Sequence, residues 1–137
     1  MNDGNGSPGR AWAGPLVGAL VGVTLVGAAA AGWAVRRTEV VGRSMAPTLE
    51  PGDRIVVLRL PRFWPLSTGQ LVALPDPRDG SRLLVKRVRS ATGRSVEVRG
   101  DNEGSSTDSR HFGPLPRREV VGRVLYRYAP AGRTGRL

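Results

Sequence analysis

The chain contains a single lysine, Lys86, among 20 arginines, and this lysine lies in the apolar run Leu83-Leu84-Val85-Lys86-Arg87-Val88. A buried ammonium can lose its proton and act as a general base, whereas a guanidinium in a protein stays protonated. The alternative is that one lysine among 21 cations is a chance result of an arginine-biased composition. The apolar neighbours favour a lysine that is there to be deprotonated, because desolvation lowers the pKa of a lysine.

Two loops rich in glycine and polar residues accompany the lysine. The first spans residues 42–49 (GRSMAPTL), and the second spans residues 100–110 (GDNEGSSTDSR). A serine flanked by glycine and proline can sit in a tight turn with its hydroxyl exposed and its N–H aimed at the same place. This arrangement supplies a nucleophile and an oxyanion donor, the two requirements of acyl transfer. The alternative for any one such serine is an ordinary turn residue.

Composition excludes several other kinds of site. The absence of cysteine excludes disulfides, thiol catalysis and cysteine-bound zinc, and the single histidine, His111, excludes a site with several histidine ligands. Acyl transfer by a serine and a lysine would need no metal and no organic cofactor, and we expect none. The net charge of +10 would permit binding to nucleic acid or anionic membranes, but the arginines are scattered and aromatic residues make up only 5%. We expect no nucleic-acid partner and a basic surface close to lipid headgroups.

The N-terminal residues predict a membrane anchor. Residues 1–10 are rich in Gly, Pro and Asn and are expected to form a disordered tail. Residues 11–35 carry no charge, and a helix needs only about 20 residues to cross the hydrocarbon core of a bilayer. Trp12 and Trp33 stand where interfacial anchors are expected. The competing interpretation is a secretory signal that is cleaved near residues 28–31.

Glycines within this segment suggest a partner for the predicted anchor. Gly14, Gly18 and Gly22 form a small-xxx-small face, which is a known contact surface between membrane helices. A helix–helix partner at this face is therefore a further expectation.

Beyond the anchor the sequence predicts an all-β domain over residues 38–128. Short β-branched runs alternate with Pro and Gly, and none has a helical period over 11 residues. Residues 91–93 are expected to form a hairpin turn, and residues 129–137 a flexible C-terminal tail. The predicted strands are Val40-Val41, Arg54 to Leu60, Gln70 to Leu74, Arg82 to Arg89, Ser95 to Arg99 and Glu119 to Tyr128.

Three motifs together resemble the type I signal peptidase family. Residues 42–49 resemble the nucleophile box of that family, and Lys86-Arg87-Val88 resembles its general-base box. Residues 100–102, followed by 106–110 and 112–116, resemble its third box and the segment after it. Each box is a modest signal, but three in the same order at compatible spacing are specific. The resemblance covers residues 40–128 and implies a compact signal-peptidase-like β domain behind one N-terminal transmembrane helix.

The resemblance also implies roles for individual residues. It makes Ser44 the nucleophile and Lys86 the general base, with Ser106 holding the lysine amine. Asp108 and Arg110 would form a supporting salt bridge, and Asp101 and Asn102 would shape the loop. Met45 and Pro47 would contact the substrate, and Gly42 stands where some relatives have a serine that assists the oxyanion. Strand alternation would send Arg87 to the opposite face from Lys86.

Two departures from the family pattern bear on the mechanism and the substrates. His111 belongs to none of the boxes, and the alternative to a Ser/Lys dyad is a Ser-His mechanism like that of the endoplasmic-reticulum signal peptidases. Only 13 residues separate Lys86 from Gly100, so the chain is similar to the minimal members. These are small bacterial forms, mitochondrial inner-membrane peptidases and the peptidases that mature nickel-containing superoxide dismutase.

The resemblance predicts a membrane-anchored serine endopeptidase that removes N-terminal leader peptides after small residues. Its partners would be leader-bearing precursor proteins and the lipid bilayer, with the catalytic domain outside the cytoplasm at the cell membrane. Arg36 and Arg37 beside the domain oppose that orientation under the positive-inside rule. Two alternatives remain, namely a maturation protease dedicated to one precursor, such as a nickel superoxide dismutase, and a non-catalytic basic β-domain tethered to the membrane.

Overall fold

The computed structural model describes residues 34–59, 61 and 63–137. The chain divides into two units, Met1–Trp33 and Ala34–Leu137, and the description concerns the second. The predicted tail at residues 1–10 lies outside the described residues, as does the predicted anchor except for its last two residues. Within the described part, no helix combines the length and the apolar character needed to cross a bilayer.

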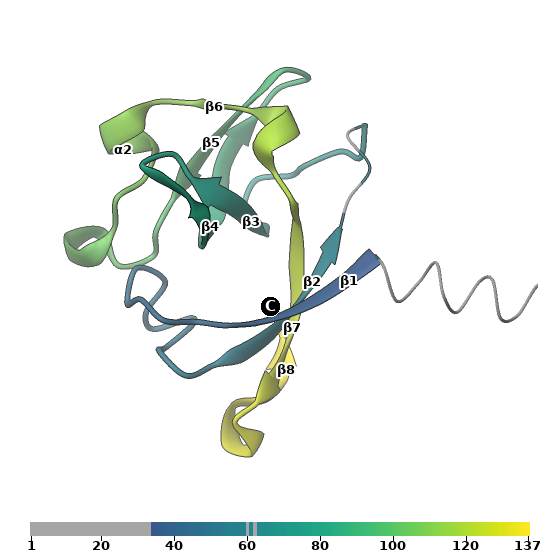
Figure 1. The fold of residues 1–137 in the computed structure, drawn as a ribbon, viewed down its shortest axis with the longest axis vertical. Coiled ribbons are helices and arrows are strands. Elements are labelled where there is room, and N and C mark those ends of the chain that lie inside the picture. Colours follow the sequence, from purple (N-terminus) through teal and green to yellow (C-terminus); the bar gives the residue numbers. More distant parts are fainter. Residues whose placement is uncertain (1–33, 60, 62) are drawn as a thin grey trace, which may run out of the picture. The chain divides into compact units, whose positions relative to one another are not determined.

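The described residues form an antiparallel β-sheet with little helix, which confirms the prediction of an all-β domain (Figure 1). The sheet order is β1-β2-β7-β3-β4-β5-β6, and β8 pairs with β7. The strands are β1 (Val35–Glu39), β2 (Arg54–Arg59), β3 (Leu71–Asp76), β4 (Asp79–Ala91), β5 (Ser95–Arg99), β6 (Leu115–Pro116), β7 (Gly122–Ala129) and β8 (Gly135–Arg136). The helical turns are η1 (Glu103–Ser105), α2 (Ser109–Phe112), η2 (Arg117–Glu119) and η3 (Ala131–Arg133).

Strand β3 lies between two hydrophobic clusters and contributes to both. Leu71 and Ala73 pack in the first cluster, whereas Val72 and Leu74 pack in the second. Successive side chains of a strand point to opposite faces, so a strand that is covered on both sides is apolar at every position. This explains the continuous run Leu71–Leu74, in which all four residues are buried. The first cluster also contains residues that follow Ser44, and the second contains Val88 of β4.

The start of the domain differs from the sequence prediction. Residues 35–39 form β1, paired with β2 from Val35↔Leu58 to Glu39↔Arg54, whereas a strand was expected at Val40-Val41. Val40 instead leaves the strand and is buried in the first hydrophobic cluster. Four of the five residues of β1 are polar or charged, so this strand lacks the apolar run by which the other strands were predicted.

The C-terminal residues 129–137 do not form the predicted flexible tail. Strand β8 pairs with β7 through Tyr126↔Arg136 and Arg127↔Gly135, and Leu137 packs against the first hydrophobic cluster. The Arg133 side chain donates to the Pro47 carbonyl at 3.3 Å, across 86 residues of sequence. The tail is therefore fixed by long-range contacts, which its glycine- and proline-rich composition does not indicate.

Candidate active site

Lys86 lies in the middle of β4, with its side chain buried. Residues 86–89 alternate between buried and more exposed positions; Val88 belongs to the second hydrophobic cluster, and the partly buried Leu84 packs against that cluster. Lys86 is only 1% exposed, and its Nζ donates to the Ser106 hydroxyl at 3.1 Å. Burial lowers the pKa of the Lys86 ammonium below its ordinary value, against the attraction of the Asp108 carboxylate. Burial thus shifts Lys86 toward the neutral amine that general-base chemistry needs.

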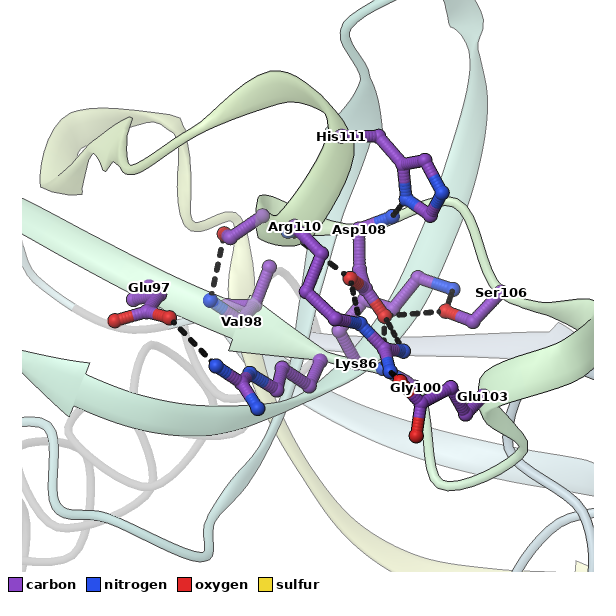
Figure 2. Close-up of polar contacts among 11 residues, drawn as sticks. Lys86, Glu97, Val98, Gly100, Glu103, Ser106, Asp108, Arg110 and His111 are labelled. Carbon is purple, nitrogen blue, oxygen red and sulfur yellow. Dashed lines mark hydrogen bonds and ion pairs between the residues drawn. The ribbon is translucent and has the colours of Figure 1, made fainter.

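The Asp108 carboxylate organises the segment that faces Lys86 (Figure 2). It is fully buried, and its Oδ2 accepts hydrogen bonds from the Ser106 hydroxyl at 2.7 Å and from the Gly100 N–H at 2.8 Å. Arg110 donates from Nε to Oδ1 at 2.9 Å and from its terminal nitrogen to Oδ2 at 2.7 Å. This arrangement joins a buried carboxylate to the hydroxyl that the lysine amine contacts.

The charge on Asp108 is stabilised by these donors. Burial by itself raises the pKa of Asp108, but the hydrogen bonds from Arg110, Gly100 and Ser106 outweigh it and hold the pKa far below its ordinary value. Arg110 also forms an ion pair with Glu103, which lies on the exposed side of the segment. Asp108 is thus an anion at any pH near neutrality, and the Ser106 hydroxyl between it and Lys86 has a fixed orientation.

Ser44 belongs to an irregular loop that is anchored by apolar residues. Met45 and Leu49 are buried in the first hydrophobic cluster, and the Leu49 N–H donates to the Met45 carbonyl at 2.8 Å. The Ser44 carbonyl accepts from the Asn102 N–H at 2.9 Å, while the Ser44 side chain is half-buried. The loop around the serine is therefore attached both to the core and to the loop that begins at Gly100.

Asp101 connects all three sequence motifs. Its carboxylate accepts from Arg87 at 2.8 Å and 2.6 Å and from the Thr48 hydroxyl at 2.6 Å. Arg87 follows Lys86 on β4 and is more exposed than the lysine, which agrees with the alternation of side chains along a strand. Thr48 lies in the loop of Ser44. The Arg87–Asp101 ion pair and the Thr48 hydrogen bond thus connect three segments: strand β4, the loop of Ser44 and the loop that leads to Ser106.

Gly100 allows the serine loop and the Ser106 segment to approach one another. A Cβ built at this position would lie 2.2 Å from the Ser106 Oγ and 2.5 Å from the Ser44 carbonyl oxygen. Real Cβ atoms do not approach other atoms this closely, so only glycine fits here. The same geometry places the Ser44 backbone beside the hydroxyl that Lys86 contacts.

A cleft of about 450 Å³ opens beside Ser44. One wall is formed by residues 38–42 with Ser44 and Met45, and the other by residues 81–85 of β4. Strand β5 pairs with β4 only from Arg87 onward, so within the described part residues 83–85 pair with β3 alone and residues 81 and 82 have no strand partner. The buried Lys86 directly follows this stretch of free strand edge.

The structure brings together most of the residues predicted for the site. Gly42 and Met45 line the cleft, and a Cβ at Gly42 would meet nothing within 4 Å. Pro47 is exposed outside the cleft lining, where its carbonyl accepts from Arg133. His111 is exposed, and its Nδ1 accepts from the Asp108 N–H at 3.4 Å in a helix capping box. The histidine therefore lies behind Asp108 and away from Lys86.

Sequence reasoning missed a second set of ionic contacts behind the serine loop. The buried Asp53 carboxylate accepts from the Glu50 N–H at 2.9 Å and pairs with Arg127 at 3.2 Å and with Arg133 at 3.3 Å. Arg127 also donates to the Thr48 carbonyl at 2.7 Å. Nothing local marks these arginines among 20, because their partner is more than 70 positions away.

Comparison with known proteins identifies the class to which this fold and site belong. The family described as "Signal peptidase, peptidase S26" matches residues 13–102 and 98–129. The chain belongs to this family, which confirms the resemblance inferred from the three motifs.

Individual relatives come from mitochondria and bacteria. The chain is 34% identical over 120 residues to the mitochondrial ATP-independent inner membrane protease subunit 1a of Arabidopsis thaliana, covering 70% of this chain and 71% of the relative. It is 29% identical over 139 residues to the probable signal peptidase I-1 of Synechocystis, covering 69% and 71%. The mitochondrial inner membrane protease subunit 1 of Mus musculus is 31% identical over 110 residues, covering 65% and 66%.

Proposed function

We propose that this chain is a membrane-anchored serine endopeptidase that removes N-terminal leader peptides after small residues, with Ser44 as nucleophile and Lys86 as general base. The observation that carries the proposal is the burial of the only lysine, whose amine donates to Ser106 beside the Ser44 loop. Residues 11–35 would form the anchor, with the catalytic domain on the extracytoplasmic face of the membrane. Family membership supports the peptidase chemistry.

The proposed reaction proceeds through an acyl-enzyme. The neutral Lys86 amine accepts the Ser44 hydroxyl proton as the serine oxygen forms a bond to the scissile carbonyl carbon, giving a tetrahedral oxyanion. The resulting ammonium returns the proton to the leaving amine as the peptide bond breaks and the Ser44 ester remains. Water then attacks the ester, again with Lys86 as base, and releases the new carboxylate. Ser106 maintains the position of the Lys86 amine throughout.

The cleft supports an extended peptide as substrate. Residues 81–85 offer an edge of β4 to which a peptide could add as a further strand through main-chain hydrogen bonds. Apolar residues, among them Val40, Met45 and Val85, line the cleft together with Ser44. A peptide in this cleft would carry its scissile bond to Ser44, and the preference for small side chains immediately before the cut follows from the family resemblance.

The test is cleavage of a leader-bearing precursor by the detergent-solubilised full chain. Ser44→Ala and Lys86→Arg are each expected to reduce cleavage to the background rate, and the second variant keeps the positive charge. Ser105→Ala, which removes an exposed hydroxyl next to Ser106, serves as the matched control and should cleave like the wild type. Mass spectrometry of the products would locate the cut after a small residue.

Each other outcome points to a different function. Retained cleavage in Lys86→Arg would overturn the dyad, and loss of cleavage in His111→Ala would then support a Ser-His mechanism. Retained cleavage in Ser44→Ala would overturn the nucleophile assignment. Cleavage of one dedicated precursor but of no general leader would restrict the function to maturation of that protein. No cleavage of any leader by the wild type would favour the non-catalytic basic domain.

A further inference from the structure

The turn between β3 and β4 contains an ion pair with a fixed geometry. Asp76, at the end of β3, is buried, and its carboxylate accepts from the Arg78 backbone N–H at 2.9 Å. The Arg78 guanidinium also donates to both carboxylate oxygens, from Nε at 3.0 Å and from a terminal nitrogen at 2.9 Å. This fork leaves the guanidinium with one defined orientation, because two parallel hydrogen bonds fix its plane.

The remaining terminal nitrogen of Arg78 reaches the loop that faces Lys86. It donates to the Thr107 hydroxyl at 3.1 Å, across 29 residues of sequence. Thr107 lies between Ser106, whose hydroxyl contacts the Lys86 amine, and the buried Asp108. The ion pair therefore connects the β3–β4 turn directly to the short segment that presents the Ser106 hydroxyl.

We propose that Arg78 is a positioning residue for the Lys86–Ser106 pair, acting through Thr107 and through its charge beside the lysine. This inference rests on the proposed function, since it assigns a role in the reaction of the same site. Asp76 is the support of Arg78, because its buried carboxylate holds the guanidinium in place. Neither residue lines the cleft, and the Lys86 amine donates to Ser106 rather than to Asp76.

Four charged groups from two neighbouring elements act on Lys86. Asp108 and Arg110 belong to the loop after η1 and the start of α2, whereas Asp76 and Arg78 belong to the β3–β4 turn. After the effect of burial, Asp108 raises the pKa of Lys86, Arg78 lowers it, Asp76 raises it and Arg110 lowers it. Removal of Arg78 alone leaves the Asp76 charge uncompensated, so it raises the pKa of Lys86.

The experiment compares the pH dependence of kcat/KM for two variants that break the same contact. Thr107→Val removes the hydrogen bond to Arg78 and keeps every charge, so kcat should fall roughly three- to tenfold. The acidic limb of the profile, which is the fall in rate at low pH as the base becomes protonated, should stay in place. Arg78→Gln should lower kcat similarly and also move the acidic limb to higher pH. The Arg78 side chain is 58% exposed, so solvent screens its charge and the shift should be small.

Further variants separate positioning from a general loss of structure. The double variant Asp76→Asn/Arg78→Gln removes both charges and should return the acidic limb toward the wild-type position. Thr107→Ser keeps a hydroxyl and should restore most of kcat. Arg94→Gln removes an exposed positive charge in the turn at the opposite end of β4, and it should leave the profile unchanged.

Superposition of the Arg78→Gln and wild-type profiles, in both height and position, would overturn the inference. An equal shift in Arg94→Gln would also overturn it, because the effect would then come from net charge alone. Both results require an active wild-type enzyme. They therefore differ from a result that contradicts the proposed function, which would be retained cleavage by Ser44→Ala or Lys86→Arg. If Arg78→Gln does not fold, as judged by its melting temperature, Thr107→Val and Thr107→Ser decide the question of positioning.

Discussion

Two buried carboxylates, Asp108 and Asp53, support the two halves of the candidate site in different ways. Each is paired with arginine and accepts a hydrogen bond from a nearby backbone N–H. Asp108 also accepts from the Ser106 hydroxyl, which contacts the Lys86 amine, so it is one hydroxyl away from the proposed base. Asp53 instead lies behind the Ser44 loop.

The Asp53 cluster acts on the backbone of the serine loop. Arg127 and Arg133 both pair with Asp53 and also donate to main-chain carbonyls, those of Thr48 and Pro47 respectively. These contacts fix the course of the loop without placing a charge next to the reactive groups. By this comparison Asp108 acts on both the position and the pKa of Lys86, the proposed base, whereas Asp53 acts on the position of the Ser44 loop.

Gly100 is the point at which the two halves meet, so its replacement should have the largest effect. The Gly100→Ala methyl group would overlap both the Ser106 hydroxyl and the Ser44 carbonyl, and it would disturb the Gly100 N–H that donates to Asp108. Because small displacements of reacting groups are costly, we expect cleavage to fall by more than about 100-fold. Initial rates of precursor cleavage measure this effect.

A matched control exists in the same loop. A Cβ at Gly104 would meet only the Asn102 side chain, at 4.0 Å, so Gly104→Ala should cleave at nearly the wild-type rate. Comparable rates for Gly100→Ala and the wild type would show that the close approach of the two loops is not needed for activity. The contact at Gly100 between the Ser44 loop, which Asp53 supports, and the Ser106 segment, which Asp108 supports, would then have no role in the reaction.

Much of this arrangement could be predicted from the sequence. Strands β2 and β5 match the predicted β-branched runs closely, because alternation and flanking turn residues are local signals, whereas β4 extends beyond its predicted run at both ends, to Asp79 and to Ala91. The apolar neighbours of Lys86 correctly indicated burial, since a strand covered by a core leaves no route to solvent for its inward side chains. The lone lysine gained its weight from the two other motifs, which stand in the same order and at compatible spacing.

The rest depends on contacts between distant segments. The sequence contains 20 arginines, and no local pattern distinguishes Arg133, which pairs with Asp53, from the arginines on the surface. The requirement for glycine at position 100 is equally hidden, because the clash involves the Ser44 carbonyl, 56 positions earlier in the chain. Such features follow from packing, and only the folded chain reveals them.

Asp108→Asn tests whether the Asp108 charge acts on Lys86, and it should have the next largest effect. Asp108 raises the pKa of Lys86, so its neutralisation lowers that pKa and moves the acidic limb of kcat/KM to lower pH. At the same time the Ser106 hydroxyl loses a charged acceptor, and we expect the plateau rate to fall by roughly 10- to 100-fold. A pH–rate profile separates the two effects.

The direction of this shift is opposite to the one expected for Arg78→Gln. Opposite shifts in the two variants would show that the protonation state of one group, Lys86, governs the acidic limb. A limb that stays in place in Asp108→Asn would contradict the assignment of Lys86 as the base, even if the plateau rate falls.

Asp53→Asn tests whether the Asp53 carboxylate only positions the Ser44 loop, and it should have the smallest effect on the reaction. The buried carboxylate pairs with two arginines that are partly exposed, with side chains 15% and 34% accessible. We therefore expect the free energy of unfolding to fall by about 1–3 kcal/mol. The rate should fall only several-fold, and the acidic limb should not move, because Asp53 is not among the charged groups that act on Lys86. Chemical denaturation of the full chain and a pH–rate profile measure both quantities.

The control for this variant is an ion pair of the same type on the surface. Glu97→Gln removes the partner of Arg99 at a site where both side chains are at least one-third exposed, and it should cost less than about 1 kcal/mol. If Asp53→Asn moved the acidic limb as far as Asp108→Asn, the two carboxylates would act on the base alike. If it left both stability and rate unchanged, the contacts from Arg127 and Arg133 to the loop carbonyls would suffice without the carboxylate, because they can form to the main chain alone.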